Sequence, residues 1–448
     1  MKNWSKNLKT LAQIAMKINL QKYSTYKSSG VEWIEDVPTH WEVKKFKRIF
    51  YEIKKRSSSK LNCGSISFGK VVYKDDEKIP ESTKKSYQVV LKGDFLVNPL
   101  NLNYDLISLR IALSDIDVVV SSGYIVLSNS VKLDKTYYKY FLHRFDVAFM
   151  KLLGSGVRQT LNWNDIANCD LIFPPLLEQT TIANFLDRKT ALIDQAVDIK
   201  QKQIELLKER RQILIHKAVT RGLNPNAKLK DSGVEWIGKI PEGWEVSKLL
   251  GLCNFIRGNS SFGKDELLNF GEYVALQYGK TYKVNEVNEQ YNYYVNNEFY
   301  KADQIVNYGD TIIISTSETI QDLGHTAYYK RNDLGLIGGE QILLNPNKEK
   351  INSHYLYFAS KVFSKELRKY ATGIKVFRFN INDLKTIYSA VPPLSEQQQI
   401  VKYIETATAK IATAISLKQQ EIEKLKEYKA TLINSAVTGK IKISNYAK

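Results

Sequence analysis

The chain has 448 residues, a length sufficient for two or three domains with cores of ordinary size. Hydrophobic residues make up 43% and charged residues 25%, with only 23 Gly and 10 Pro, which excludes the disordered, collagen-like and membrane classes. The net charge of +18 favours a polyanionic partner, because each contact of Lys or Arg with a phosphate releases condensed counterions. Nucleic acid is the natural candidate, and a basic protein without such a partner is the alternative.

Residues 1–27 are expected to form an amphipathic lead to the first domain. Their apolar residues recur at helical spacing, at Trp4, Leu8, Leu11, Ala15 and Ile18. The lead has no continuous apolar stretch and no small-residue cleavage site, so it does not resemble a secretion signal. No apolar run in the chain approaches the roughly 18 residues of a membrane span. We therefore expect a cytoplasmic protein.

The cysteines Cys63, Cys169 and Cys253 are scattered along the chain, and so are the five histidines. An odd number of separated cysteines argues against a disulfide framework. Neither residue type shows the close spacing of metal ligands. We expect no metal site in this chain.

Residues 28–174 are predicted to form a first domain of mixed α and β structure. Apolar runs at 117–120 and 124–127, bounded by polar or Gly-rich breaks, are typical of strands. Residues 137–153 carry aromatic residues and Leu at helical spacing, which predicts a helix late in the domain.

Residues 175–222 are predicted to form a spacer helix. No Pro or Gly interrupts them between the Pro-Pro at 174–175 and Gly222, and Pro cannot lie inside a helix. Roughly 40 helical residues span about 60 Å at 1.5 Å per residue. Their apolar positions keep a heptad rhythm, namely Ile182, Leu186, Ile193, Val197, Ile204, Leu207, Leu214 and Ala218.

The remainder of the chain repeats this module. SGVEWI occurs at Ser29–Ile34 and again at Ser232–Ile237, and residues 29–46 match residues 232–249 at 11 of 18 positions. A second match begins at PPLLEQ and PPLSEQ, from Pro174 and Pro392, and has 22 identities in 49 positions. The offset between the copies grows from 203 to 218. The ends of the module are therefore expected to be scaffold, and the middle the part that varies with the target.

The second copy comprises a domain at 223–392, a spacer helix at 393–440 and a tail at 441–448. Strands are predicted at 311–314 and 341–344, and a helix at 353–370. The heptad seam of the second spacer helix consists of Ile400, Ile404, Ile411, Ile415, Ile422, Leu425, Leu432 and Ala436.

Each seam requires a partner, and both are interrupted by cations at matching places: Lys200 and Arg211 in the first helix, Lys418 and Lys429 in the second. Matched seams are best satisfied by packing on each other, antiparallel if the copies are related by a pseudo-twofold axis. Two alternatives are that each helix packs on its own domain and that the helices mediate dimerisation.

No catalytic motif is complete. A DNA methyltransferase requires a Gly-rich AdoMet loop and an Asn-Pro-Pro-aromatic turn, and the nearest pieces, at 98–100 and 345–347, lack the second Pro and the aromatic residue. The closest nuclease pattern, Glu52-Ile53-Lys54 behind Asp36, is not repeated in the second copy.

Two loops match the first seven positions of a phosphate-binding P-loop. They are Gly64–Lys70 and Gly258–Lys264, and each is followed by Val71 or Asp265 instead of the hydroxyl that would bind magnesium. A nucleotide site is therefore not expected. We expect plain surface turns or, through Lys70 and Lys264, contacts with DNA phosphates.

The segments that best fit DNA reading lie late in each domain, at 156–165 and 373–380. They combine cations with amides, and Arg suits guanine edges while Asn and Gln suit adenine. The alternative is that their Asn and Asp residues only cap helices near Asp165 and Asp383. The candidate residues are Arg158, Gln159, Asn162, Trp163, Lys375, Arg378 and Asn380.

A second pair of candidate loops, 98–110 and 315–325, follows a Gly-Asp in each domain. Arg110 is the candidate DNA contact in the first of them. The two loops differ completely in sequence. Two half-sites of different sequence would require different loops on the same scaffold.

With its duplicated SGVEWI-Pro-Trp and PPL-x-EQ-long-helix motifs, the chain resembles the specificity subunits of type I restriction-modification systems. The resemblance covers nearly all of the chain after residue 28. It implies an α+β fold of two pseudo-twofold-related mixed α/β target-recognition domains, separated by an antiparallel two-helix coiled coil. Each domain would read one half of a bipartite, asymmetric double-stranded DNA site, and the helices would set the gap.

The resemblance also implies partners. Two modification (methyltransferase) subunits with AdoMet would dock on the helices, and restriction subunits would add ATP- and Mg-dependent translocation and cleavage. This chain would then be no enzyme and would bind no cofactor itself. The alternatives are a coiled-coil scaffold that binds proteins and, more remotely, a self-contained methyltransferase.

Overall fold

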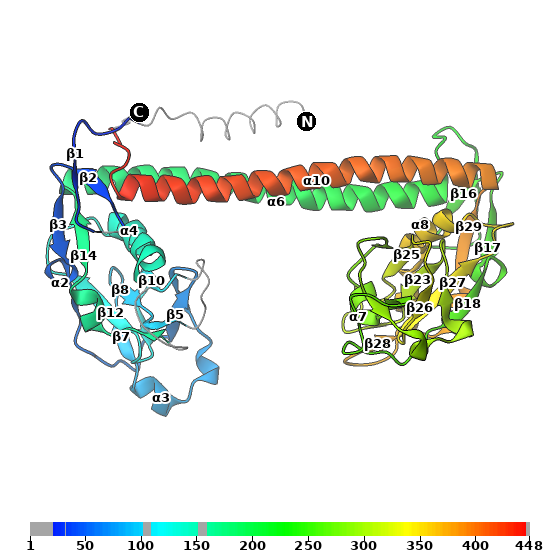
Figure 1. The fold of residues 1–448 in the computed structure, drawn as a ribbon, viewed down its shortest axis with the longest axis horizontal. Helices are drawn as coiled ribbons and strands as arrows, with labels where there is room; N and C mark the ends of the chain where they lie inside the picture. The colour runs from blue at the N-terminus through cyan, green and yellow to red at the C-terminus, as the bar shows by residue number, and fades with distance from the viewer. Residues whose placement is uncertain (1–20, 32, 102–108, 151–158, 445–448) are drawn as a thin grey trace. The chain divides into compact units, whose positions relative to one another are not determined.

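The computed structural model describes residues 21–31, 33–101, 109–150 and 159–444 (Figure 1). The chain divides into two compact units. Unit 1 comprises residues 1–201 and 419–448, and unit 2 comprises residues 202–418. Each unit therefore contains one mixed domain together with a part of each long helix.

The domain of unit 1 is built on a four-stranded antiparallel sheet with the order β10-β8-β12-β4, and helix α4 packs on β10 (Figure 1). Its elements are β1 (Tyr26–Ser28), β2 (Asp36–Pro38), β3 (Glu42–Lys45), α2 (Phe46–Ile49), β4 (Phe50–Glu52), β5 (Gly64–Ser67), β6 (Lys70–Tyr73), α3 (Glu81–Lys85), β7 (Gln88–Val90), β8 (Phe95–Val97), β9 (Leu100–Asn101), β10 (Ile111–Leu113), β11 (Val118–Val120), β12 (Ile125–Asn129), α4 (Lys135–Ala148), β13 (Gln159–Thr160), α5 (Trp163–Ala167) and β14 (Asp170–Phe173).

The domain of unit 2 repeats this plan with additions. Its main sheet has the order β18-β27-β23-β25-β20, which is the order of unit 1 plus one strand. Its elements are β15 (Leu229–Asp231), β16 (Lys239–Pro241), β17 (Glu245–Lys248), β18 (Cys253–Arg257), β19 (Tyr273–Leu276), α7 (Tyr278–Thr281), β20 (Glu286–Val287), β21 (Tyr294–Val295), β22 (Ile305–Val306), β23 (Thr311–Ile314), β24 (Thr316–Ser317), β25 (Thr326–Tyr329), β26 (Gly335–Ile337), β27 (Gln341–Pro346), α8 (Ser353–Phe363), β28 (Phe377–Arg378), α9 (Ile381–Thr386) and β29 (Tyr388–Val391).

The pairings outside the main sheets repeat as well. β14 pairs with β3 as β29 pairs with β17, β11 pairs with β7 as β26 pairs with β22, and β1 pairs with β2 as β15 pairs with β16. Among the described residues, unit 2 adds β20 and β21, and unit 1 has the β5–β6 hairpin instead.

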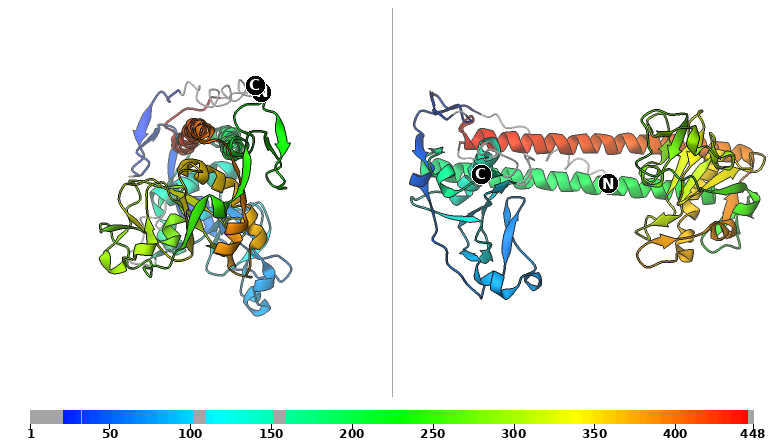
Figure 2. Two further views of the ribbon diagram at one scale, coloured as in Figure 1. Left: turned by 90° about the vertical axis from the view of Figure 1, so that its right-hand side faces the viewer. Right: turned by 60° about the horizontal axis from the view of Figure 1, so that its bottom comes forward.

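The spacer helices are α6 (Leu176–Arg221) and α10 (Leu394–Val437). Each begins directly after its Pro-Pro, as the sequence predicts. All of the predicted seam residues are buried or half-buried. Within each unit the two helices lie side by side and antiparallel (Figure 2). In unit 1, Lys200 on α6 forms an ion pair with Glu421 on α10. Asp194, which precedes Lys200 on α6, forms one with Lys429, which follows Glu421 on α10, as antiparallel helices require.

In unit 2, α6 and α10 enter one apolar core with α8. Ile215 and Val219 on α6 and Ile400 and Ile404 on α10 are buried in this cluster. Helix pairing and packing on a domain are therefore not alternatives, because each half of each helix does both.

The two duplicated motifs are brought together in each domain. The indole Nε1 of Trp41 donates to Glu178 Oε2 at 3.1 Å in unit 1, and that of Trp244 donates to Glu396 Oε2 at 2.9 Å in unit 2. Trp41 and Trp244 belong to the first motif, and Glu178 and Glu396 to the PPL-x-EQ motif. This bond fixes the start of each long helix against the domain that precedes it.

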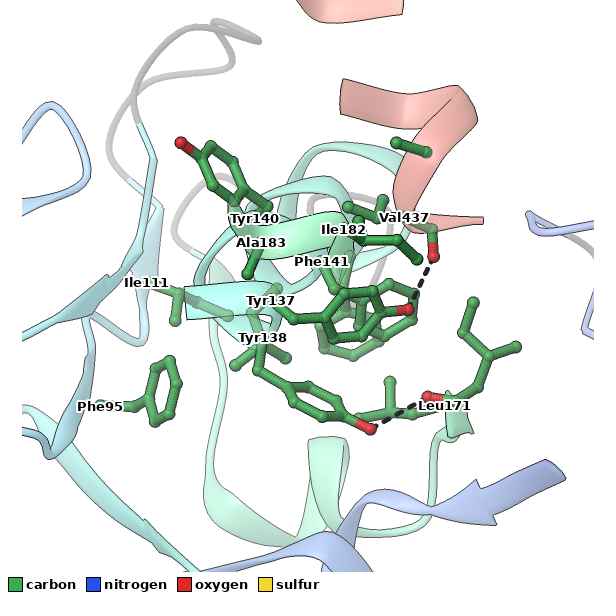
Figure 3. Close-up of a cluster of buried hydrophobic side chains, with 14 of the residues drawn as sticks. Phe95, Ile111, Tyr137, Tyr138, Tyr140, Phe141, Leu171, Ile182, Ala183 and Val437 are labelled. Carbon is green, nitrogen blue, oxygen red and sulfur yellow. Dashed lines mark hydrogen bonds between the residues drawn. The ribbon is translucent and has the colours of Figure 1, made fainter. Parts of the chain in front are cut away.

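Each domain also holds the end of the other long helix. The buried Tyr137 on α4 donates its hydroxyl to the Val437 carbonyl of α10 at 2.8 Å (Figure 3), and Tyr355 on α8 donates to Val219 of α6 at 3.1 Å. Around Tyr137, Figure 3 shows Tyr138, Phe141 and Ile182 in one apolar cluster. The similar ends of the module are therefore scaffold, because they join helices to domains.

The predicted strands are present as β11, β12, β23 and β27. The helix predicted at 137–153 is α4, which ends at Ala148 within the described residues. The helix predicted at 353–370 is shorter than expected. It ends at Phe363 and continues as a separate 3-10 turn at Glu366–Tyr370, which still buries Leu367 in the core.

Candidate nucleic-acid interface

The structure joins the two candidate segments of each domain into one short ribbon. In unit 1, β13 of the 156–165 segment pairs antiparallel with β9 of the 98–110 loop. In unit 2, β28 of the 373–380 segment pairs antiparallel with β24 of the 315–325 loop, with Thr316 opposite Arg378 and Ser317 opposite Phe377. Sequence reasoning identified these segments separately and gave no sign that they meet.

The ribbon of unit 2 extends into a tight hairpin. Thr372 and Arg378 exchange backbone hydrogen bonds of 2.9 Å in both directions. Between them Gly373 has φ +113, and a Cβ there would meet the Val376 carbonyl oxygen at 2.0 Å, so only Gly fits. The tip carries Ile374, which is 95% exposed. Phe379, which is buried, anchors the base of the hairpin in the core.

Two of the candidate contacts in this hairpin lie on the surface. Lys375 is exposed at the tip, and the Arg378 side chain is 61% exposed on β28. Nη2 of Arg378 lies 3.6 Å from Oε1 of Glu340. The other oxygen of Glu340, Oε2, accepts from the hydroxyl of Thr316 on β24. One carboxylate thus contacts both strands of the ribbon.

Asn162 and Asn380 cap helices. Oδ1 of Asn162 accepts from the backbone N–H groups of Asn164 and Asp165 at 2.9 and 3.3 Å, and Asp165 returns a bond to the Asn162 N–H. Asn380 makes the same capping box at the start of α9, with Asp383 as its partner. The capping role, which was the alternative to base contacts, is therefore present for both residues.

Arg110 and Trp163 are structural as well. Arg110 is 4% exposed, and its Nε donates to the fully buried Asp146 at 2.8 Å, so the prediction of a surface contact at Arg110 is wrong. A buried charge of this kind must be paired, and the carboxylate of α4 supplies the pair. Trp163 packs edge-on against Phe46, with 5.8 Å between ring centroids, at the margin of the core.

The two segments that resemble a P-loop lie at different places in the two domains and have different structures. In unit 1, β5 and β6 form a hairpin whose turn residues, Phe68 and Gly69, both have positive φ. Such a turn matches the twist of the strands and leaves Phe68 78% exposed beside the exposed Lys70. In unit 2, residues 258–264 directly follow β18 and are irregular; they bury Phe262 and expose Lys264. The shared P-loop-like sequence pattern is therefore not one loop repeated in both domains.

Arg158 lies outside the described residues. Gln159 is placed by its backbone alone, in β13 opposite Asn101. Among the candidates that the structure describes, the cations Lys70, Lys264, Lys375 and Arg378 are exposed, and so are the capping residues Asn162 and Asn380. The four cations stay our predicted DNA contacts, together with Arg158 and Gln159.

Carboxylates and tyrosines surround the ribbon of unit 2. Burial, followed by the charges of Glu318, Glu340 and Asp322, raises the pKa of Tyr278. Burial and a hydrogen bond to Asp322 raise the pKa of Tyr282 to about 12. Both phenols are therefore neutral donors at physiological pH. Sequence reasoning missed Glu340, although the preceding Gly338-Gly339 signals an unusual backbone there.

Within the described ranges, no group of three or more His, Cys, Asp or Glu side chains is arranged to hold a metal ion. In the same part of the chain, no helix combines the length and apolar character needed to cross a membrane.

The family model of the type I restriction modification DNA specificity domain matches the chain twice, at residues 38–209 and 241–427. The two matches together cover well over half of the chain. The chain belongs to the family of type I restriction-modification specificity subunits. The two matches correspond to the two copies of the module in this specificity subunit, and each includes a domain and most of the spacer helix that follows.

Two relatives are similar to the chain, one over its whole length and one over less than half of it. A protein of Methanocaldococcus jannaschii named "Putative type I restriction enzyme MjaX specificity subunit" is 27% identical, over 96% of this chain and all of the relative. The type I restriction enzyme EcoKI specificity subunit of Escherichia coli is 21% identical over 46% of this chain and 44% of its own.

Solved structures share the fold of this specificity subunit. A chain from a study of complex assembly and conformational transition in the type I R-M system superposes with a TM-score of 0.68 at 16% identity, over 90% of this chain and 98% of that one. The HsdS subunit from Thermoanaerobacter tengcongensis superposes with a TM-score of 0.50 at 17% identity, over the same fractions. The α+β fold of two mixed domains and antiparallel long helices is thus that of specificity subunits.

Proposed function

We propose that this specificity subunit has no catalytic site and that each of its domains reads one half of a bipartite, asymmetric DNA site. The observation that carries the proposal is the hydrogen-bonded joining of two candidate segments into one ribbon in each domain. The ribbons are held by the same frame but differ in sequence, as two unlike half-sites require. A two-stranded ribbon is also narrow enough to enter the major groove of DNA.

The long helices are proposed to set the gap between the half-sites. Their ends are fixed to the domains by the bonds of Trp41, Tyr137, Trp244 and Tyr355, so that a domain cannot slide along its helix. A change in helix length should therefore change the gap.

The chemistry is proposed to reside on partner subunits. Two modification subunits with bound AdoMet would methylate the site, and restriction subunits would use ATP and Mg²⁺ to translocate and cleave DNA. The specificity subunit itself would bind no cofactor. Because the proposed target is cellular DNA, the proposed location is the cytoplasm.

Reconstitution tests the proposal. The purified chain alone should neither methylate nor cleave DNA, whereas addition of the cognate modification subunits and AdoMet should give methyl transfer at one bipartite sequence. Binding by this complex should weaken steeply with salt, because Lys and Arg contact phosphates. Activity of the lone chain would contradict the non-catalytic assignment, and binding without salt dependence would favour a protein-binding scaffold.

A domain exchange tests the assignment of half-sites. Residues 44–173 are replaced by the corresponding segment of another specificity subunit, and the methylated sequence is determined by methylome sequencing of the host strain. Only one half-site should change, while the other half and the gap stay as they were. A change in both halves would show that the domains do not read DNA independently.

A further inference from the structure

Glu340 has a backbone conformation that its residue type disfavours. Its φ is +64, in the left-handed region where an L side chain is strained. It lies between Gly339 and the start of β27, and its carbonyl accepts from the Ser315 N–H at 3.0 Å. A Gly at this position would avoid the strain, and two glycines directly precede it.

The ion pair of the Glu340 side chain does not by itself offset this strain. Its ion pair with Arg378 is 3.6 Å long, with the two side chains 47% and 61% exposed, and exposed ion pairs contribute little to stability. The hydrogen bond from Thr316 joins Glu340 to the ribbon but leaves Oε1 facing Arg378. A residue held in a strained conformation beside the ribbon is a candidate for a functional role.

The Arg378–Glu340 pair is chemically complementary to the major-groove edge of one base pair. In the major groove, guanine presents two acceptors, O6 and N7, which suit Arg, and its partner cytosine presents an N4 amino donor, which suits a carboxylate. Arg378 and Glu340 place a fork of donors beside a carboxylate acceptor. Their charges cancel, so the pair attracts a phosphate less than a lone Arg does.

We propose that Arg378 and Glu340 together recognise one guanine·cytosine pair, with Glu340 both positioning the guanidinium and accepting from the cytosine amino group. This inference rests on the proposed function of the second domain and names the chemistry of its ribbon. It predicts that the half-site read by this domain contains a guanine·cytosine pair. The preference at that position should depend on both side chains.

The chain supplies a matched control at Glu35. This residue also has a positive φ, +66, and forms an exposed ion pair, with Lys440 at 2.7 Å. It lies in the turn of the first shared motif, outside both ribbons. The second copy has Gly238 at the corresponding position, with φ +70, so Glu35→Gly is compatible with the fold.

The experiment compares Glu340→Gly, Arg378→Ala and Glu35→Gly in the complex with modification subunits. Methylation rates are measured on duplexes that carry every base-pair substitution in the determined site. Glu340→Gly and Arg378→Ala should reduce the preference for guanine·cytosine by about 10-fold at the same single position of the second half-site. Glu35→Gly should leave the whole preference profile unchanged.

Thermal unfolding separates this role from a structural one. Glu340→Gly removes the backbone strain but also the bond from Thr316, and it gives the unfolded chain more freedom, so its melting temperature should change little although its preference is relaxed. Glu340→Gln keeps the side-chain length and an acceptor for Thr316, and it should relax the same position.

Three results would overturn the inference: an unchanged preference profile for both Glu340 variants, relaxation spread over several positions, or a half-site without a guanine·cytosine pair. Each of these leaves the proposed function intact, because the unchanged complex is still selective. Loss of all sequence preference in the unchanged complex would overturn both.

Discussion

The ammonium nitrogen of Lys429 on α10 lies 2.7 Å from both carboxylate oxygens of Asp194 on α6. The equivalent ion pair cannot form at the other end of the helices, because the positions related to Lys429 and Asp194 by the offset of 218 hold Arg211 and Ala412. The bond of Lys200 to Glu421 is likewise unmatched, since Lys418 and Gln203 hold the related positions. These two ion pairs can form when α6 packs on α10, but not when α6 packs on a second α6 or α10 on a second α10. Charges beside a coiled-coil seam select the partner helix in this way.

The Lys429–Asp194 pair is expected to select the partner more than to stabilise the fold. Asp194 is 58% exposed, so Lys429→Ala should cost only about 0.2–1 kcal/mol, whereas Leu432→Ala in the buried seam should cost about 2–5 kcal/mol. Lys429→Glu should be more harmful than Lys429→Ala, and Asp194→Lys should restore it. Urea unfolding of the four variants measures this, and failure of the exchanged pair to recover would contradict the assignment.

Helix length is expected to set the gap between half-sites. Seven residues with the heptad pattern are inserted into both helices, after Gln201 in α6 and after Lys418 in α10, so that the seams stay in register. The insertion adds about 10 Å, or about three base pairs at 3.4 Å each. Methylome sequencing should find both half-sites unchanged and the gap longer. An unchanged gap would exclude the helices as the spacer.

The two copies of the Trp–Glu bond are expected to differ in strength. Glu178 accepts from Tyr23, His40 and Trp41, and although burial opposes it, these bonds lower the pKa of the carboxyl group. Glu178→Gln should therefore destabilise the start of α6 by about 1–2 kcal/mol. The effect should be present above the unfolded pKa near 4.3 and disappear as pH falls through the lower folded pKa.

Glu396→Gln is the matched variant, in which the bond from Trp244 is replaced in the second copy. We expect a smaller effect, of about 0.5–1.5 kcal/mol, at the start of α10. Hydrogen exchange of the amides in the first turns of each helix measures both effects locally. Equal effects in the two copies would show that the additional bonds of Glu178 contribute nothing.

His143 on α4 is expected to make unit 1 sensitive to acid. Burial, with a smaller contribution from the charge of Lys139, lowers the pKa of His143 to about 4. The folded state keeps the ring neutral, whereas the unfolded state takes up a proton below about 6.5, so stability is lost as pH falls from about 6.5 to 4. The loss should reach up to about 3 kcal/mol.

Melting temperatures between pH 4.5 and pH 7.5 test this dependence. His143→Gln should flatten the pH dependence of unit 1 over this interval, because Gln does not titrate. An equal slope in the variant would assign the acid sensitivity to other groups.

Much of the candidate site was visible in the sequence, but its assembly was not. The segments around Arg378 and Thr316 are 62 positions apart along the chain, and nothing in their composition predicts that they hydrogen-bond. The capping roles of Asn162 and Asn380 were recognised as an alternative, because Asn followed by Asp at the third position is a local pattern. The burial of Arg110 had no local sign, since its partner Asp146 lies on a separate helix.

By itself the sequence determined the duplicated module, the two long helices and the family, because heptad spacing, Pro-Pro starts and repeated motifs are local or periodic signals. The tertiary structure decided which residues reach the surface and which segments meet. Exposure of Lys375 and Arg378, burial of Arg110 and the contact of Glu340 with both strands of its ribbon depend on long-range packing. Such packing is set by the whole core, and no short stretch of sequence encodes it.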